Sequence, residues 1–356
     1  MSGLDDVIAA ETTLSEVDGT NGRLVICGYR LDELAGSKSY EEVLALLAGE
    51  VLPRGAALKT RLGMARLRAF AEVAWLDEAI LALSITEGLR ALMARLPDGE
   101  DADTALLLVA APAVFVPALV RRKAGQAAIA PDPALGHAAD MLAMLKGKAP
   151  SKAEIEALDT YLVTVSDHGL NASTFAARVV ASTRAGYTSA VLAALGALKG
   201  PLHGGAPGPV LDMLDAVGTP ERASSWLTGE LARGERLMGF GHRIYRVRDP
   251  RADALKGALA RLGAAGDMDA ERIKLAEAVE REALALLRLK KPDRALDTNV
   301  EFFTALLLEA LGFPRDAFTG VFAAGRVGGW LAHAHEQVAN GRLIRPQSRY
   351  VGPKAA

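Results

Sequence analysis

The stretch ALLLVAAPAVFVPALV, residues 105–120, is uncharged throughout and decides what kind of protein this chain forms. Arg121-Arg122-Lys123 follows it directly. The uncharged run is shorter than the ~20 residues that a helix needs to cross a bilayer, and it contains Pro112 and Pro117. We therefore interpret it as a helix buried in the core of a helical protein and not as a membrane span.

Helical periodicity dominates the rest of the chain, and Ala and Leu are abundant, so the sequence predicts a mainly α-helical protein. The exception is residues 12–29, where short apolar runs are separated by Asp18-Gly19 and Asn21-Gly22. Such dipeptides are typical of turns between short strands. Residues 172–200 are crowded with small side chains, which favours close helix packing, either in the deep core or at a subunit interface.

The length of 356 residues is enough for about two domains, at roughly 150 residues per domain. From residue 207 to about residue 292 the sequence is richer in charge, and apolar sequence returns at Phe302. We interpret this middle part as a smaller domain inserted into a larger one. The predicted division is 1–205 and 313–356 for the large domain and 206–312 for the small inserted domain.

Charge balance and cysteine content exclude several protein classes. The 41 Lys and Arg residues against 43 Asp and Glu residues give a net charge of −2, which argues against a dedicated nucleic-acid binder. Cys27 is the only cysteine, so an internal disulfide and a cysteine-based zinc site are both excluded. The acidic N-terminus lacks the pattern of a signal peptide, so the sequence predicts a cytoplasmic protein without a membrane partner.

Histidines and arginines supply the candidate site. His168, His203 and His242 each lie beside glycine or in a short polar cluster, where a ligand can approach the ring closely. Arg326 lies in an apolar, Gly-rich stretch predicted to be helical, and Arg251 follows Asp249-Pro250. A guanidinium in an apolar helix needs a partner, and a carboxylate binds it through two hydrogen bonds. The combination predicts an anionic carboxylate substrate.

Other chemistries lack their motifs. His333 and His335 are two apart on a predicted helix and so point to different faces, and no His-Glu-x-x-His or cysteine pair occurs, so no metal site is predicted. The sequence His203-Gly204-Gly205 is similar to a lipase oxyanion motif, but the chain has no Gly-x-Ser-x-Gly nucleophile elbow. It has no glycine-rich phosphate loop either.

Six motifs together resemble the citrate synthase family, in the family's order and from Gly3 to Gly352. They are TLSEVDG (13–19), SDHGLNAST (166–174), KGPLHGGA (199–206), GFGH (239–242) with DPRA (249–252), NVEF (299–302), and IRP (344–346) ahead of YVG (350–352). The resemblance implies an almost entirely α-helical homodimer, in which a smaller inserted domain closes over the substrates. It also implies condensation of acetyl-CoA with oxaloacetate, with CoA as a co-substrate and no permanently bound cofactor.

The resemblance implies a role for each candidate residue. His203 stabilises the enolate, His242 polarises the ketone of oxaloacetate, and Glu301 is the base. The positions that hold the oxaloacetate or citrate oxygens are His168, Arg251, Arg326 and Arg345, with Arg345 expected from the other subunit. Arg246 matches a position that contacts the CoA phosphate, and the alternative for it is a solvated surface arginine.

The chain departs from the family pattern around the reaction centre. Glu301 stands where the family has aspartate, Asp297-Thr298 where Tyr-Pro is common, and Pro207-Gly208 where Asn-Glu is usual. An added methylene moves the carboxylate by roughly an ångström, and displacements of that order can cost about a hundredfold in rate. Three hypotheses follow: a citrate synthase with Glu301 as base, a 2-methylcitrate synthase that uses propionyl-CoA, and a non-catalytic paralogue that binds CoA or dicarboxylates.

Overall fold

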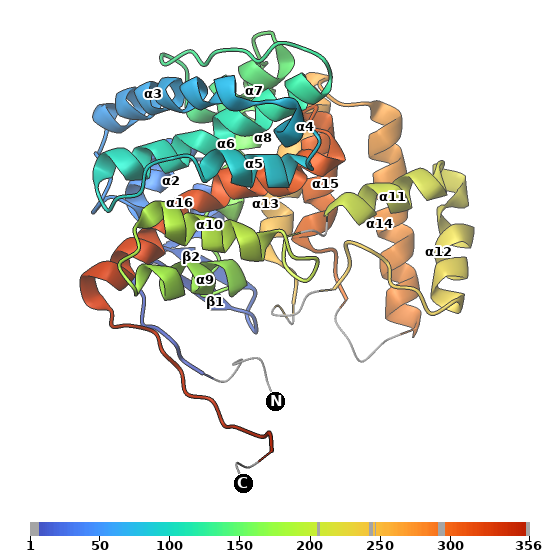
Figure 1. The fold of residues 1–356 in the computed structure, drawn as a ribbon. Coiled ribbons are helices and arrows are strands. Elements are labelled where there is room, and N and C mark those ends of the chain that lie inside the picture. Colours follow the sequence, from blue (N-terminus) through green and yellow to red (C-terminus); the bar gives the residue numbers. More distant parts are fainter. Residues whose placement is uncertain (1–6, 205–206, 242–244, 246, 291–295, 354–356) are drawn as a thin grey trace.

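The computed structural model describes residues 7–204, 207–241, 245, 247–290 and 296–353. In these residues three short strands precede a series of helices (Figure 1). The predicted mainly α-helical class is confirmed. The strands are β1 (Ser15–Asp18), β2 (Arg23–Ile26) and β3 (Tyr29–Arg30). The α-helices are α1 (Leu31–Leu34), α2 (Tyr40–Leu47), α3 (Ala56–Ala71), α4 (Glu78–Leu81), α5 (Ile85–Met93), α6 (Ala102–Lys123), α7 (His137–Lys146), α8 (Lys152–Val165), α9 (Ala172–Ala181), α10 (Tyr187–Leu198), α11 (Pro207–Val217), α12 (Ala223–Ala232), α13 (Pro250–Ala265), α14 (Ala270–Lys290), α15 (Val300–Ala310) and α16 (Phe318–Asn340). The 3-10 helices are η1 (Glu72–Trp75), η2 (Pro220–Arg222) and η3 (Arg315–Ala317).

The predicted N-terminal turn joins β1 and β2 into an antiparallel hairpin, and β3 pairs with β2. The Asp18 carboxylate accepts hydrogen bonds from the backbone N–H groups of Thr20 (3.1 Å) and Asn21 (3.0 Å), and so closes the turn. Gly22 then adopts the left-handed region, with φ +63°. Asp18 and Gly22 therefore form the turn that their residue types predict.

Helix α6 carries the uncharged stretch and lies in the core. It has 22 residues, long and apolar enough to cross a membrane, but 83% of its apolar window is buried inside the protein. It packs against α3, α5, α7 and α16. The helix is longer than the uncharged stretch, because Asp101 caps its start and Arg121-Arg122-Lys123 form its last turn.

Helix α16 runs through the core beside the end of α8, and two glycines permit this. A Cβ added to Gly325 would lie 2.5 Å from Val165 Cγ2, and one added to Gly329 would lie 2.2 Å from the Ser166 carbonyl oxygen. Both distances are too short for any larger residue. The glycines therefore bring Arg326, which lies between them, to the carboxyl end of α8.

Helices α11, α12 and α14 form a lobe on the right of the view in Figure 1, next to the main body. Helix α12 packs against α14, whereas α13 packs against α8 and α15. Helix α11 begins at Pro207, where proline costs no hydrogen bond because the first helical N–H groups have no partner within the helix. The division into 1–205 with 313–356 and 206–312 stays a prediction.

Candidate active site

His203 lies in the turn after α10 and is held by a serine from α9. Its Nε2 is 2.8 Å from Ser173 Oγ, and Trp330 Nε1 donates to the same oxygen at 3.1 Å. Ser173 Oγ donates to Asn171 Oδ1 at 2.8 Å, and the direction of its contact with His203 Nε2 depends on the tautomer of the ring. Burial, aided by the positive charge of Arg326, lowers the pKa of His203 to about 4. The ring is therefore neutral near pH 7.

Arg326 places a guanidinium in the buried interior of the protein, with 1% of its surface exposed. Its Nε donates to the Val165 carbonyl oxygen. The guanidinium carbon is 4.9 Å from the centre of the Phe322 ring, which lies 6.4 Å from the His203 ring. Among the described residues no acidic side chain forms an ion pair with Arg326. Burial lowers its pKa to about 10, so the group remains charged at pH 7.

Glu301 lies in the first turn of α15. The cap residue Asn299 accepts a hydrogen bond from the Glu301 backbone N–H at 3.0 Å and donates from Nδ2 to the Gly241 carbonyl oxygen at 2.8 Å. The start of α15 is thereby tied to the segment that precedes position 242. Burial raises the pKa of Glu301 to about 7, although the positive charge of Arg251 opposes the shift. At neutral pH the carboxyl group can accept or release a proton.

Tyr245 connects two of the predicted substrate-binding residues. Its hydroxyl group is 3.0 Å from His168 Nε2, and its ring centre is 5.7 Å from the guanidinium carbon of Arg251. Asp249 begins α13 and accepts from Arg251 Nε at 3.0 Å and Nη2 at 2.8 Å. All four side chains are buried. Sequence reasoning missed Tyr245, which lies between the GFGH (239–242) and DPRA (249–252) motifs.

A second set of buried charges supports the loop of His168. Arg178 donates to His333 Nδ1 from Nε at 3.1 Å and from Nη2 at 2.9 Å. Nδ1 is therefore the acceptor, and Nε2 of the neutral ring donates to Asp167 Oδ2 at 3.2 Å. Burial raises the pKa of Asp167, but the contact with His333, the hydrogen bond from Ser15 and the charge of Arg326 together hold this pKa below its usual value. His333 thus orients a neighbour of His168, a role that sequence reasoning did not assign.

The structure brings together five of the eight predicted site residues: His168, His203, Arg251, Glu301 and Arg326. Arg345 is exposed, on the extended segment that follows α16 and runs away from the body in Figure 1. His242 and Arg246 lie outside the described residues. No group of three His, Cys, Asp or Glu side chains in the described ranges is arranged to hold a metal ion.

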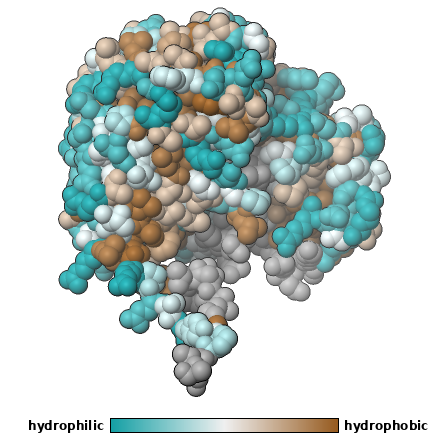
Figure 2. All heavy atoms as spheres, in the orientation of Figure 1, coloured by the Kyte–Doolittle hydropathy of each residue, from teal (hydrophilic) through white to brown (hydrophobic). Residues whose placement is uncertain are grey.

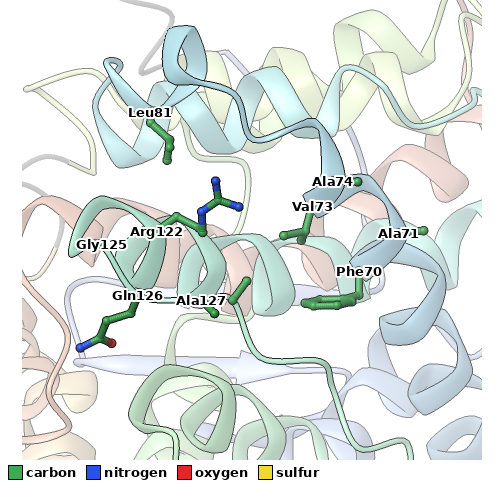
Figure 3. A pocket seen from close by; sticks show the side chains of 10 residues that line it. Phe70, Ala71, Val73, Ala74, Leu81, Arg122, Gly125, Gln126 and Ala127 are labelled. Carbon is green, nitrogen blue, oxygen red and sulfur yellow. The ribbon is translucent and has the colours of Figure 1, made fainter.

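A surface cavity of about 820 Å³ lies elsewhere, between α3, η1 and the end of α6 (Figure 3). Its walls are mainly apolar, with Phe70, Val73 and Leu81 around the Arg122 side chain. None of the predicted site residues lines it. The five predicted site residues that the structure brings together lie instead in the interior, between α8, α13, α15 and α16. We take this region as the candidate active site.

Comparisons with known proteins show the family of this chain. Residues 3–347 match the family model described as citrate synthase, C-terminal domain. The citrate synthase of Haloferax volcanii is 39% identical over 99% of this chain and 96% of its own length. A 2-methylcitrate synthase of Mycobacterium tuberculosis is 36% identical over 98% of this chain and 90% of its own. The solved structure of the ternary complex of carboxymethyl coenzyme A and oxaloacetate with citrate synthase from Thermoplasma acidophilum superposes with a TM-score of 0.84 at 29% identity, covering 99% of this chain and 96% of that one. The chain therefore belongs to the citrate synthase family, whose members are acyltransferases.

Proposed function

We propose that the protein is a citrate synthase that condenses acetyl-CoA with oxaloacetate and hydrolyses citryl-CoA to citrate and CoA. The observation that carries the proposal is Arg326, a buried cation without a carboxylate partner in the described part of the chain. It lies near a neutral imidazole, His203, and a carboxyl group with a pKa of about 7, Glu301. The relative from Thermoplasma acidophilum, solved with oxaloacetate and a CoA analogue, supports the proposal.

The acetyl methyl group is a very weak acid, so its proton is removed only if a base and a hydrogen-bond donor act together. In the proposed mechanism the Glu301 carboxylate takes this proton, while His203 donates to the thioester oxygen. In the proposed reactive state the Ser173 hydroxyl proton turns from Asn171 Oδ1 to His203 Nε2, so that the ring proton lies on Nδ1 and can serve as that donor. The enolate carbon then attacks the ketone carbon of oxaloacetate, and the ketone oxygen gains the electron pair of the broken π bond and takes up a proton to become the hydroxyl group of citryl-CoA. Water then cleaves the thioester and releases citrate and the CoA thiol.

Oxaloacetate carries two carboxylates, which need cationic partners. Arg326 is the group that the protein leaves available for one of them. We assign His168 and Arg251 to the remaining oxygens, with Tyr245 holding both in place. In this proposal His242 polarises the ketone oxygen of oxaloacetate, and Arg246 contacts the CoA phosphate. Residues 206–312 form the small domain that closes over the substrates.

We further propose a homodimer formed through α9 and α10, with Arg345 donated to the partner's site. Figure 2 shows apolar surface over the part of the front face where these helices lie in Figure 1. Val179, Val180 and Leu192 are only half-buried there, and a Cβ added to the exposed Gly196 would meet no atom within 4 Å. Small side chains of this kind allow close approach of a second copy.

Light scattering should give twice the chain mass of 37.4 kDa for the wild-type protein. Gly196→Arg should give the monomer mass, because the long charged side chain would be buried between the copies. Gly229→Arg, in α12 of the lobe, is the matched control and should leave the dimer intact. A monomeric wild-type protein, or equal behaviour of the two variants, would contradict this interface.

The acyl group distinguishes two enzymes of the family. The relative from Mycobacterium tuberculosis is a 2-methylcitrate synthase, which favours propionyl-CoA as a second candidate. One methylene in an apolar pocket changes discrimination by only ~1–3 kcal/mol, so one site can accept both thioesters. The preferred thioester must therefore be measured.

Release of the CoA thiol tests the proposal, with oxaloacetate present and acetyl-CoA and propionyl-CoA offered in parallel. Reactions without oxaloacetate correct for thioester hydrolysis. Cys27 adds little background, because it is half-buried and burial raises the pKa of its thiol to about 11. Sustained turnover supports a synthase. Faster turnover of acetyl-CoA indicates a citrate synthase, and faster turnover of propionyl-CoA indicates a 2-methylcitrate synthase. Absence of turnover from a folded protein that still binds oxaloacetate would reject the synthase and favour a non-catalytic paralogue.

A further inference from the structure

We infer that the N-terminal hairpin of β1 and β2 sets the distance between the loop that carries His168 and the start of α13, which carries Arg251, and that Gly22 is a positioning residue for dicarboxylate binding. The inference rests on the proposed function for the identity of the dicarboxylate. The contacts of the hairpin stand independently of it. One end of the hairpin touches the loop after α8, and the other touches the segment that leads into α13.

The first contact joins β1 to the loop of His168. Ser15 Oγ accepts a hydrogen bond from the Gly169 backbone N–H at 3.0 Å. Gly169 has φ +60°, and a Cβ added to it would lie 3.1 Å from Val17 Cγ2. The strand is therefore packed directly against the residue that follows His168, so a shift of β1 would shift this loop.

The second contact joins the hairpin turn to the start of α13. A Cβ added to Gly22 would lie 2.7 Å from Val247 Cγ2 and 2.9 Å from the Arg248 carbonyl oxygen. Neither distance leaves room for a methyl group. Arg248 directly precedes Asp249, the residue that holds the Arg251 guanidinium. A shift of the Arg248 backbone would therefore move the Asp249 carboxylate, and with it the Arg251 guanidinium.

The hairpin is rigid enough to transmit such a shift. Its strands pair in register from Ser15–Ile26 to Asp18–Arg23, and Asp18 closes the turn through two backbone N–H groups. A cavity of about 560 Å³ lies beside the turn, and each of the arginines that line it is paired with an acid. These pairs are Arg23–Glu16, Arg30–Asp32 and Arg248–Asp253. The cavity therefore offers no unpaired cation for an anion, and the hairpin acts through packing.

Gly22→Ala tests the inference, with Gly28→Ala as the matched control. Both glycines have a left-handed backbone, with φ +63° and +86°, so both substitutions introduce the same kind of strain. Only at Gly22 does the new methyl group meet Val247 and Arg248, because a Cβ at Gly28 would meet nothing within 4 Å. Since a displacement of about 1 Å can cost on the order of a hundredfold, Gly22→Ala should raise the KM for oxaloacetate roughly tenfold. We expect kcat and the KM for the thioester to change less than about twofold, and Gly28→Ala to leave all three constants near wild type.

Amide hydrogen exchange gives a second readout that needs no substrate. Peptides that cover 166–174 and 247–255 should exchange faster in Gly22→Ala than in Gly28→Ala. Equal exchange and equal KM in the two variants would overturn the inference. If the wild-type protein binds oxaloacetate without turnover, the Kd from calorimetry replaces KM. If it does not bind oxaloacetate, the proposed function fails, and exchange in the two peptides alone decides the role of the hairpin.

Discussion

Glu301→Gln should lower kcat by about a thousandfold, within the ~10²–10⁴ that general-base catalysis contributes. Glutamine has nearly the same shape but cannot take the methyl proton. The KM for oxaloacetate should stay within about twofold, because Arg326, Arg251 and His168 are unchanged. Steady-state release of CoA measures both constants. Glu309→Gln is the matched control on the same helix. Glu309 lies away from the site, and its carboxylate is 2.8 Å from Arg272 Nε. Retained turnover in Glu301→Gln would remove Glu301 as the base.

The pH dependence separates the two protonation states of Glu301. Wild-type kcat/KM should rise with pH through about 7, because only the carboxylate can act as a base and burial raises its pKa to about 7. His203, whose pKa is lowered to about 4, stays neutral over that range. A profile that is flat between pH 6 and 8 would contradict this assignment.

The same shift in pKa predicts a change in stability. The pKa of Glu301 rises from 4.5 to about 7 on folding, so the folded state favours the protonated carboxyl group. This contribution is fully present below pH 4.5 and is lost as pH rises through 7. Glu301→Gln should therefore exceed wild type in free energy of unfolding by roughly 3–3.5 kcal/mol at pH 8, at ~1.4 kcal/mol per pKa unit. The difference should vanish at pH 4, and denaturant unfolding at both pH values measures it.

Arg326→Met is expected to weaken oxaloacetate binding at least about a hundredfold, since a buried charge pair across an interface is worth ~2–5 kcal/mol. Methionine keeps the apolar contacts of the side chain but provides no charge for the substrate carboxylate. The free variant should be at least as stable as wild type, because a buried charge without an acidic partner in the described ranges has been removed. Calorimetry gives the Kd, and thermal unfolding with and without oxaloacetate gives the stability.

Arg66→Met is the matched control for Arg326→Met. Arg66 is as buried as Arg326, but its Nε is 2.5 Å from Asp140 Oδ2. Its removal leaves a buried carboxylate without its partner, which typically costs ~3–5 kcal/mol. Arg66→Met should therefore lose stability while its folded fraction still binds oxaloacetate. If Arg326→Met keeps the wild-type Kd, Arg326 is not a substrate ligand and the observation that supports the proposed function is lost.

The sequence alone determined the helical class, the core position of α6, the turn at 18–22 and the family. These features depend on signals between near neighbours: helical periodicity, turn residues and short motifs. A motif also pointed to His203, and the apolar, Gly-rich stretch around position 326 pointed to Arg326, because a buried guanidinium needs a partner. Even α6 was longer than its uncharged stretch, because its capping residues lie outside that stretch.

Only the tertiary structure decided how these residues work. Arg326 donates to the Val165 carbonyl oxygen and pairs with no acid in the described part of the chain, and these two residues, from α16 and α8, are 161 positions apart in the sequence. The contacts of His203 with Ser173, of Tyr245 with His168, and of Gly22 with Arg248 likewise join distant segments. The pKa of Glu301 follows from its burial, which local sequence does not encode. Packing between distant segments creates the burial, charge and spacing that turn a set of motif residues into a site.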